Sequence, residues 1–334
     1  MGRAPGCIWQ ACHCNIGAAL PINSSMTPII SRELPPVAAL VVGYMPDRPV
    51  LDRLLLSLLA EAEAVFLLDN GGSQEYLSDL PAERARVRYI DMGGNAGLGA
   101  ALNRGMQEAR AAGLRYVITF DQDSAPPDGM PQALLDAMQT QQQAGISCAA
   151  VGPLFYDRRE EQMRCFPLYR ERHGRIHVTP GENAEPLHEV DVLITSGMLV
   201  DSDAWAEGLH YEEGLMVDYT DTDWCFRARA AGKRLFVCAQ VRMPHALSDT
   251  PPVRVLGVYL LRYSPLRRYY YFRNTAYFVR RPYVSPAWRR RLLAGLPVRL
   301  ISNLVLDEQP WHSLRLSLKG FWHGLRGRLG PYPS

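Results

Sequence analysis

Short apolar runs alternate with amphipathic segments along the first half of the chain. The runs end at turn residues, as strands buried on both faces do; they cover residues 37–43, 64–68, 87–90, 116–120 and 148–154. Apolar side chains recur at helical spacing over residues 51–59, 98–106 and 130–143. Asp47 is placed to cap the first of these helices, with Pro49 in its first turn. This alternation predicts an α/β fold with a mostly parallel central sheet flanked by helices.

The second half of the chain has a less regular pattern. Residues 155–189 are polar and irregular, strands are predicted within 190–200 and over 234–239, and a helix is predicted over 220–231. The chain is therefore expected to have three parts. They are a poorly ordered tail over residues 1–34, an α/β domain over 35–250 and a C-terminal basic and aromatic helical extension over 251–334. Within the tail, Met26 is an alternative start of translation to Met1.

Composition narrows the class of protein. The chain has 334 residues, of which 47% are hydrophobic and 21% charged, as is usual for a globular protein. Its net charge of +2 gives no reason to expect a nucleic-acid partner. The seven cysteines show no metal-binding spacing and their odd number does not suggest a disulfide framework. With no evident signal peptide and no apolar window of about 20 residues, the protein is expected to be cytoplasmic or attached to a membrane surface.

Polar side chains follow the predicted strands where each strand ends. They are Tyr44, Asp69, Asn95, Asp121 and Asp123. Ligands of parallel α/β sheets bind beyond the carboxyl ends of the strands, so these residues predict a binding site at that edge.

Asp121 and Asp123 are the clearest candidates for a metal site. They end an apolar strand, and residues two apart in an extended segment face the same way. Two carboxylates suit Mg²⁺ or Mn²⁺, whose remaining ligands can be diphosphate oxygens. The alternative is a plain turn, because Asp, Ser and the following prolines favour one.

Asp69 and the glycine-rich segment 94–99 are candidates for nucleotide contacts. A carboxylate at the position of Asp69 can accept a hydrogen bond from a base or a ribose hydroxyl. Residues 94–99 open a predicted helix, whose N-terminus would suit phosphate. The structural alternative for Asp69 is a plain Asp-Asn-Gly-Gly turn, and the alternative for residues 94–99 is a turn that starts a helix.

Asp221 and Asp223 stand at the start of the helix predicted over 220–231. A carboxylate in reach of an acceptor hydroxyl can act as general base. Asp223 has structural alternatives, since it stands at capping-box spacing from Thr220 and at ion-pair spacing from Arg227. Asp221 is therefore preferred as the base.

Two further features concern the metal and a membrane. His245 is a candidate third metal ligand or phosphate contact, although a lone loop histidine is often structural. Basic and aromatic residues interleave over 262–274, and arginine, tryptophan and leucine recur in 289–291 and 311–328. Such helices suit an anionic membrane surface, or else form a solvated face packed on the α/β domain.

Taken in order, these segments resemble the family-2 glycosyltransferases, in particular the bacterial rhamnosyltransferases. The resemblance runs from about residue 37 to about residue 281. Its motifs are VVGY at 41–44, DNGG at 69–72, GNAG at 94–97, DQDS at 121–124, TSG at 195–197, VDYTDTDWCFR at 217–227, His245 and YYYFRN at 269–274.

The resemblance implies a GT-A fold over 35–250 and direct displacement with inversion at the anomeric carbon. It implies that Asp221 is the catalytic base and that Asp123, assisted by His245, holds a divalent cation. The nucleotide sugar would contact Tyr44, Asp69, Asn95, Gly97 and Asp121. The acceptor would contact Ser196, Gly197, Asp218 and Trp224.

The expected function is transfer of L-rhamnose from dTDP-L-rhamnose to a saccharide or lipid-linked acceptor, in the synthesis of a surface polysaccharide, lipopolysaccharide or glycolipid. The protein is also expected to make peripheral contact with the inner face of the cytoplasmic membrane. Two alternatives stay open: another donor such as a UDP-hexose, and a nucleotide-sugar-binding protein without catalysis.

Overall fold

A computed structural model describes residues 35–72, 86–157, 164–245, 253–255, 258–260, 264–307 and 309–333. The tail predicted over residues 1–34 lies outside these residues, and so does the predicted boundary at 250/251. Residues 34–334 form one compact unit.

An eight-stranded sheet forms the centre of this unit, in the order β3-β2-β1-β4-β9-β5-β10-β8. Its strands are β1 (Val37–Gly43), β2 (Ala64–Asp69), β3 (Val87–Asp91), β4 (Tyr116–Asp121), β5 (Cys148–Tyr156), β8 (Leu187–Val190), β9 (Met198–Asp201) and β10 (Arg234–Pro244). Strands β3, β2, β1 and β4 pair in parallel, as do β5 and β10. Strand β9 is antiparallel to both β4 and β5, and β8 is antiparallel to β10. The prediction of a mostly parallel sheet is confirmed.

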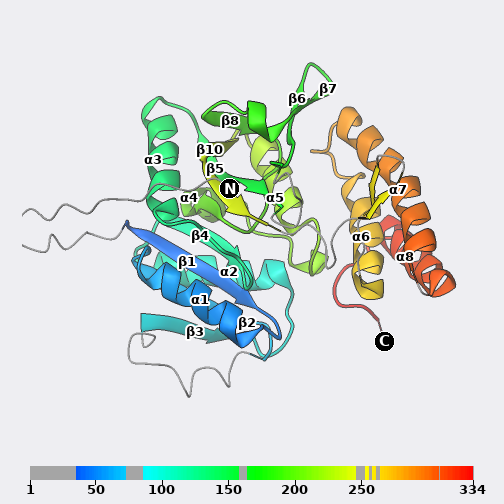
Figure 1. Ribbon diagram of the computed structural model, residues 1–334, viewed down its shortest axis with the longest axis horizontal. Coiled ribbons are helices and arrows are strands. Elements are labelled where there is room, and N and C mark those ends of the chain that lie inside the picture. Colours follow the sequence, from blue (N-terminus) through cyan, green and yellow to red (C-terminus); the bar gives the residue numbers. More distant parts are fainter. Residues whose placement is uncertain are drawn as a thin grey trace, which may run out of the picture. The chain divides into compact units, whose positions relative to one another are not determined.

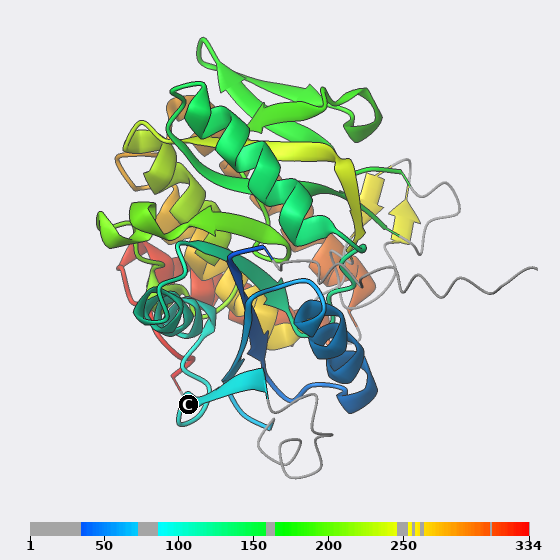
Figure 2. The same cartoon turned by 90° about the vertical axis from the view of Figure 1, so that its left-hand side faces the viewer.

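Helices cover both faces of the sheet, because alternate residues of the buried strands point to opposite sides. Val37, Ala39 and Val41 of β1 pack in one core with helices α1 (Arg48–Leu59) and α3 (Met130–Gln143). Ala38 and Leu40 pack in the other core. That core holds α2 (Leu98–Ala111), α4 (Ser202–Ala206) and α5 (Thr220–Ala230), as Figures 1 and 2 show. The Asp47 side chain accepts a hydrogen bond from the Val50 backbone N–H, which confirms the predicted cap of α1.

The structure corrects the interpretation of residues 155–189 as irregular. This segment holds an antiparallel hairpin of β6 (Leu168–Arg172) and β7 (Arg175–Thr179), a short 3-10 helix η3 (Gly181–Asn183) and strand β8. The hairpin strands are mostly half-buried or exposed and therefore lack the apolar runs that reveal buried strands.

Two other sequence predictions also differ from the structure. The strands expected within 190–200 reduce to β9, and β10 runs on to Pro244 past an irregularity after Cys238. The capping box of Thr220 and Asp223 is absent, because the Thr220 hydroxyl donates to the Val217 carbonyl. Tyr219, in a left-handed conformation, occupies the N-cap position of α5 instead.

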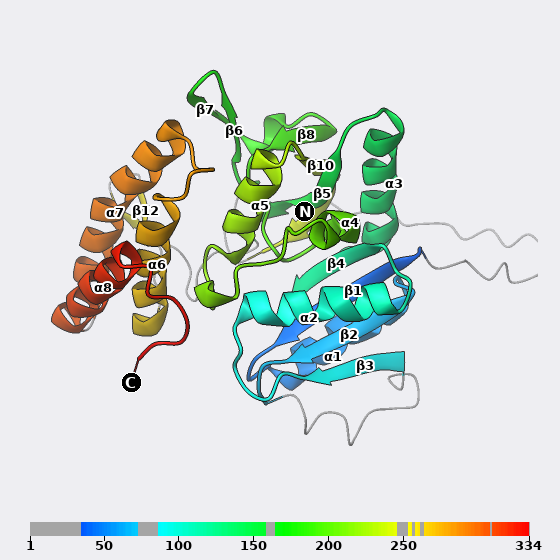
Figure 3. The same ribbon diagram turned by 180° about the vertical axis from the view of Figure 1, so that it is seen from behind.

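The predicted C-terminal helical extension is present. It consists of α6 (Pro265–Phe278), α7 (Pro286–Leu306) and α8 (Pro310–Leu325), preceded by the short strands β11 (Val253–Val255) and β12 (Val258–Leu260). Helix α6 lies between the sheet and the other two helices, as Figures 1 and 3 both show. Phe278 and Trp288 pack against Phe226 of α5. Over the described residues, each helix is too short or too polar to span a lipid bilayer.

Candidate active site

The strand register brings the predicted strand-end residues to one edge of the sheet. Val42 of β1 pairs with Asp121 of β4, and the adjacent Gly43 pairs with Asp69 of β2. Just beyond β1, the Tyr44 backbone N–H donates to Oε1 of Gln122 at 2.6 Å. The carboxyl ends of β2, β1 and β4 are thus held side by side, as the sequence predicts.

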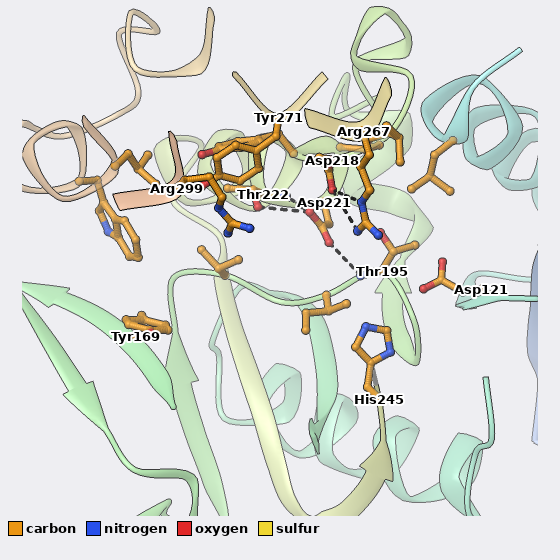
Figure 4. Close-up of a pocket in the computed structure, with 18 residues that line it drawn as sticks. Asp121, Tyr169, Thr195, Asp218, Asp221, Thr222, His245, Arg267, Tyr271 and Arg299 are labelled. Carbon is orange, nitrogen blue, oxygen red and sulfur yellow. Dashed lines mark hydrogen bonds and ion pairs between the residues drawn. The ribbon is translucent and has the colours of Figure 1, made fainter. Parts of the chain in front are cut away.

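A cavity of about 520 Å³ opens next to this edge. Its walls come from the end of β4, residues 192–195, the segment 217–222 at the start of α5, strand β6 and helices α6 and α7. Four predicted site residues line it: Asp121, Asp218, Asp221 and His245. Figure 4 shows Asp121 and His245 at one end, the Asp218–Arg267 pair and Asp221 in the middle, and Tyr169 at the other end. Residues from the sheet and from the C-terminal helices therefore share one cavity.

Asp121 is the carboxylate with the fewest protein partners in the cavity. Within the described part of the chain, its side chain forms no hydrogen bond or ion pair. Burial, followed by the charges of Asp123 and Asp221, raises the pKa of Asp121 to about 7, and Arg267 opposes this shift. A carboxylate in this setting is available to a cation or a ligand hydroxyl.

Asp221 is fixed by backbone and side-chain donors. One carboxylate oxygen accepts from the backbone N–H and the hydroxyl of Thr222, and the other accepts from the backbone N–H of Thr195 at 3.2 Å. Burial raises the pKa of Asp221, although these hydrogen bonds act in the opposite direction. The carboxylate is thus held in one orientation beside the cavity with a proton affinity above that of an exposed aspartate.

Asp218 is paired with a cation from the C-terminal extension. Its carboxylate lies 3.2 Å from the Arg267 guanidinium. Burial raises the pKa of Asp218, and Arg267 opposes the shift.

The loop around Asp218 has a strained backbone that helix α6 holds in place. Met216 and Tyr219 have positive φ angles of 66° and 76°, which are unfavourable for non-glycine residues. The Asn274 amide donates to the carbonyls of Leu215 and Asp218, at 3.0 and 2.7 Å. Arg273, also fully buried, donates to the Leu215 carbonyl at 2.9 Å. These contacts fix the wall of the cavity from behind.

His245 reaches the cavity from the end of β10. Its backbone N–H donates to the Tyr156 carbonyl at 2.9 Å, and its ring packs on Phe155 with centroids 5.2 Å apart. The ring faces the same end of the cavity as Asp121 (Figure 4).

Four predicted nucleotide contacts, Tyr44, Asp69, Asn95 and Gly97, lie outside the cavity lining, and the Tyr44 side chain is exposed. Asp69 is buried, and its carboxylate accepts from Tyr89 Oη at 2.7 Å and from the Gly71 N–H at 2.8 Å. Asn95 caps the following turn by accepting from the Gly97 N–H. Gly97, at φ 90°, lies so close to the loop at Met216 that a Cβ there would approach the Met216 Cα to 3.0 Å. These residues have structural partners here, and their nucleotide contacts stay predictions.

The remaining predicted residues also lie away from the cavity. Asp123 is exposed and lies near α1, although its charge contributes to the raised pKa of Asp121. Ser196 is fully buried with its hydroxyl 2.6 Å from that of Ser124, and a Cβ on Gly197 would overlap Met130. Trp224 is fully buried, and its indole N–H donates to the Leu209 carbonyl. The acceptor roles of Ser196, Gly197 and Trp224 remain predictions that this geometry does not support directly.

Helix α6 and strand β6 contribute residues to the cavity that the sequence pattern does not predict. Arg267, Tyr271 and Tyr169 line the cavity, and Arg273 and Asn274 hold its wall. The interleaved arginines and tyrosines of 262–274 predict a surface that contacts a membrane or a solvated face packed on the α/β domain, and neither alternative places Arg267 or Tyr271 in the cavity. The sequence signal in α6 is Asn274, an amide that follows a run of aromatic residues. A buried amide needs hydrogen-bond partners, so its presence there indicates contacts with another segment.

The carboxylates at the end of β4 suit a divalent cation whose remaining coordination positions are filled by a bound ligand. No group of three or more His, Cys, Asp or Glu side chains in the described segments is arranged to hold a metal ion by itself. Asp121 and Asp123 repel each other, which a cation between them would relieve. Mg²⁺ is commonly bound by one or two carboxylates together with substrate phosphates. These residues therefore suit a metal that binds with a diphosphate.

The chain is similar to known glycosyltransferases. Residues 42–189 match the family described as Glycosyl transferase family 2. The chain is 29% identical over 252 residues to the dTDP-rhamnosyl transferase RfbF of Shigella flexneri, with 74% of this chain and 81% of that protein covered.

Solved structures share the fold. S. aureus TarS in complex with UDP-GlcNAc aligns with a TM-score of 0.54 at 14% identity, over 86% of this chain and 81% of the TarS fragment. GalNAc-T7 with UDP, GalNAc and Mn²⁺ aligns with a TM-score of 0.51 at 12% identity, over 78% of this chain. This chain spans only about half, 54%, of the GalNAc-T7 chain. At these identities the likeness establishes the fold alone.

The fold is the GT-A fold that these structures share. Residues 42–189 carry a domain of Glycosyl transferase family 2, and the chain is similar to the rhamnosyl transferase RfbF.

Proposed function

We propose that this protein transfers L-rhamnose from dTDP-L-rhamnose, with inversion, to a hydroxyl of a saccharide or lipid-linked acceptor in the assembly of a surface polysaccharide, lipopolysaccharide or glycolipid. The observation that carries the catalytic proposal is that Asp121 and Asp221 line one cavity. The donor, dTDP-L-rhamnose, is proposed because the chain is similar to RfbF, which is named a dTDP-rhamnosyl transferase.

Asp221 is the proposed catalytic base. Its carboxylate takes the proton of the acceptor hydroxyl while the hydroxyl oxygen bonds to the anomeric carbon of the donor. The bond from that carbon to the diphosphate oxygen breaks, and dTDP leaves with the electron pair. Burial supports this role, because it raises the pKa of Asp221 and so makes the carboxylate a better proton acceptor.

The leaving diphosphate is proposed to bind at the end of the cavity that holds Asp121 and His245. A divalent cation bound by Asp121, and by Asp123 from just outside the cavity, with His245 nearby, would neutralise charge that builds on the diphosphate. Mg²⁺ and Mn²⁺ both suit such oxygen ligands. Arg267 adds a fixed positive charge to the same cavity.

The acceptor is proposed to bind at the other end of the cavity. Tyr169, Tyr271 and Trp288 line this end together with Leu292. Aromatic side chains provide flat apolar surfaces with a polar edge, which suit the apolar face of a sugar ring or a lipid chain. Of the acceptor residues predicted from sequence, Asp218 lies on this cavity and is kept in the proposal.

The proposed location is the cytoplasm, with peripheral contact at the inner face of the cytoplasmic membrane. The cysteines in the described residues, Cys148, Cys165, Cys225 and Cys238, are buried and free, which suits a reducing compartment. Helices α7 and α8 are the elements proposed to contact the membrane.

A donor panel tests the proposal. The purified protein is incubated with dTDP-L-rhamnose, UDP-glucose or UDP-GlcNAc, with Mg²⁺, Mn²⁺ or EDTA, and release of the nucleoside diphosphate is measured. Release from dTDP-L-rhamnose that EDTA abolishes is expected. Release only from a UDP-sugar would favour the second candidate, a UDP-hexose donor, for which the UDP-GlcNAc complex of TarS is the supporting observation. Tight donor binding that never leads to turnover would favour a non-catalytic binding protein.

A further inference from the structure

Exposed apolar side chains are concentrated on the last two helices. Among the described residues, twelve large hydrophobic side chains are exposed, and seven of them belong to α7 and α8. The most exposed are Trp311 at 75%, Val305 at 68% and Ile301 at 61%. Isolated exposed hydrophobics are ordinary, but this concentration on two neighbouring helices indicates a surface that binds something.

These side chains form a stripe on each helix. On α7 the exposed positions Ala294, Val298, Ile301 and Val305 recur at intervals of three and four residues, which is one face of a helix. On α8 the exposed apolar positions Trp311, Leu318 and Trp322 share one face in the same way. The two helices pack against each other, on the side of α6 that is away from the sheet (Figures 1 and 3). We call the apolar residues 298, 301, 305, 311, 318 and 322 the outer stripe.

Positive charge surrounds the outer stripe. Residues 264–333 contain twelve arginines and one lysine but only two acidic residues, Asp307 and Glu308. Exposed cations stand at both ends of the stripe, at Arg290 and Arg326, and within it at Arg315. The Arg326 guanidinium lies 4.3 Å from the centroid of the Trp322 ring. Tryptophan and leucine beside arginine is the composition of helices that lie in the interface of an anionic membrane.

The opposite face of α7 belongs to the active-site cavity. Trp288, Leu292 and Arg299 line the cavity, whereas Val298, Ile301 and Val305 face outward. One helix therefore separates the apolar end of the cavity from the outer stripe. A surface that covers the stripe would lie close to the site proposed for the acceptor.

We infer that the outer stripe of α7 and α8 docks on an anionic phospholipid bilayer, and that this docking presents the acceptor end of the cavity to membrane-borne, lipid-linked saccharides. The docking surface is assigned from exposure and charge alone. The consequence for the acceptor rests on the function proposed above.

Vesicle sedimentation tests the docking surface with the full-length protein. Binding is expected to vesicles of phosphatidylcholine with about 30% phosphatidylglycerol, and to fall steeply with phosphatidylcholine alone or in about 0.5 M salt. Leu318→Ser and Ile301→Ser are each expected to weaken binding about tenfold or more. Arg315→Gln is expected to weaken it about fivefold.

Matched controls lie on the other side of the fold. Leu56→Ser changes an exposed leucine of α1, and Arg104→Gln changes an exposed arginine of α2. Both are expected to bind vesicles like the unchanged protein. Circular dichroism and nucleoside-diphosphate release confirm that each variant is folded.

Three results would overturn the inference: no binding of the unchanged protein to anionic vesicles, equal loss in Leu318→Ser and Leu56→Ser, or a stable dimer in solution that Leu318→Ser dissociates. The last result would assign the stripe to a second copy of the chain. Donor turnover is measured in the same preparations without vesicles. Loss of turnover with intact vesicle binding therefore counts against the proposed function and not against the docking surface.

Discussion

The Arg267 guanidinium lies 3.2 Å from the carboxylate of Asp218, and both side chains line the same cavity. Asp218 belongs to the loop before α5, whereas Arg267 belongs to α6 of the C-terminal extension. The extension therefore gives the cavity a charge that the sheet does not supply. In a chain that ends before α6, the cavity would lack this wall.

Arg267→Gln is expected to raise the KM for the donor about tenfold to a hundredfold. The guanidinium is a cation close to the proposed diphosphate site, and a lost charge-assisted contact costs about 1.5–3 kcal/mol. Steady-state kinetics with varied donor measure the effect. Arg267→Lys is the matched variant and should restore part of the affinity, because it keeps the charge but not the forked geometry. An unchanged KM in Arg267→Gln would place the diphosphate elsewhere.

Asp221→Asn is expected to lower kcat by about 10²–10⁴-fold, since the amide cannot take a proton from the acceptor. The amide keeps the size of the side chain, so donor binding measured by calorimetry should stay within about twofold. Asp203→Asn is the matched control, because Asp203 also stands in the first turn of a helix, α4, but outside the cavity. Equal kinetics for the two variants would remove Asp221 from the role of base.

The pH dependence of the reaction should reflect the environment of Asp221. Burial raises the pKa of this carboxylate, and the base must be ionised, so kcat/KM is expected to fall as the pH drops through a value above that of an exposed aspartate. Thr222→Val removes the hydroxyl that donates to Asp221 and therefore raises the pKa further. The acidic limb of the profile should move to higher pH in this variant. A limb that stays in place, or moves to lower pH, would indicate another titrating group.

The carboxylates of the site were predictable because they follow local rules. Asp121 ends an apolar strand, and in parallel sheets such ends lie at the ligand-binding edge. Asp221 begins a helix after a cluster of acids, and the competing structural role of Asp223 is confirmed by its ion pair with Arg227. Spacing along the chain therefore suffices to predict that these two residues lie at the cavity beside the sheet edge, and their chemical roles stay predictions.

The residues contributed by distant segments were not predictable from spacing. Asn274 meets the Asp218 carbonyl across 56 positions of the chain, and Tyr169 reaches the cavity from a hairpin with little apolar character. Their roles depend on tertiary packing, which periodicity does not encode. Ser196 and Trp224, for which the resemblance implies acceptor contacts, are both fully buried, so their acceptor roles stay predictions.

Asn274→Leu is expected to lower the free energy of unfolding by about 2–4 kcal/mol. The Asn274 amide is fully buried, and its loss leaves the Asp218 carbonyl without this donor and Arg273 Nε without its acceptor, at about 1–3 kcal/mol each, whereas the Leu215 carbonyl keeps its hydrogen bond from Arg273. Urea unfolding measures the change. Because the strained loop that carries Asp218 loses its support, kcat should fall in conditions where the variant is still folded. The exposed Gln143→Leu, at the end of α3, is the control and should change neither quantity appreciably.

Asp191 is expected to be the most sensitive charged residue for stability outside the cavity. Its carboxylate is fully buried and is bound by Arg170 of β6, Arg229 of α5 and the indole N–H of Trp288 of α7, at 3.0, 3.1 and 2.7 Å. Asp191→Asn removes the negative charge but nearly preserves the shape, so Arg229 loses its buried counter-ion and Arg170 keeps only Glu189. Removing one partner of a buried ion pair costs about 3–5 kcal/mol.

The position of Asp191 gives this variant a second expected effect. Since Trp288 lines the apolar end of the cavity, its displacement should weaken acceptor use while donor hydrolysis by water is retained. Urea unfolding and the ratio of transfer to hydrolysis measure the two effects separately. Asp136→Asn, on the exposed face of α3, is the matched control. Stability equal to that of this control would mean that Asp191 does not hold the hairpin, α5 and α7 together.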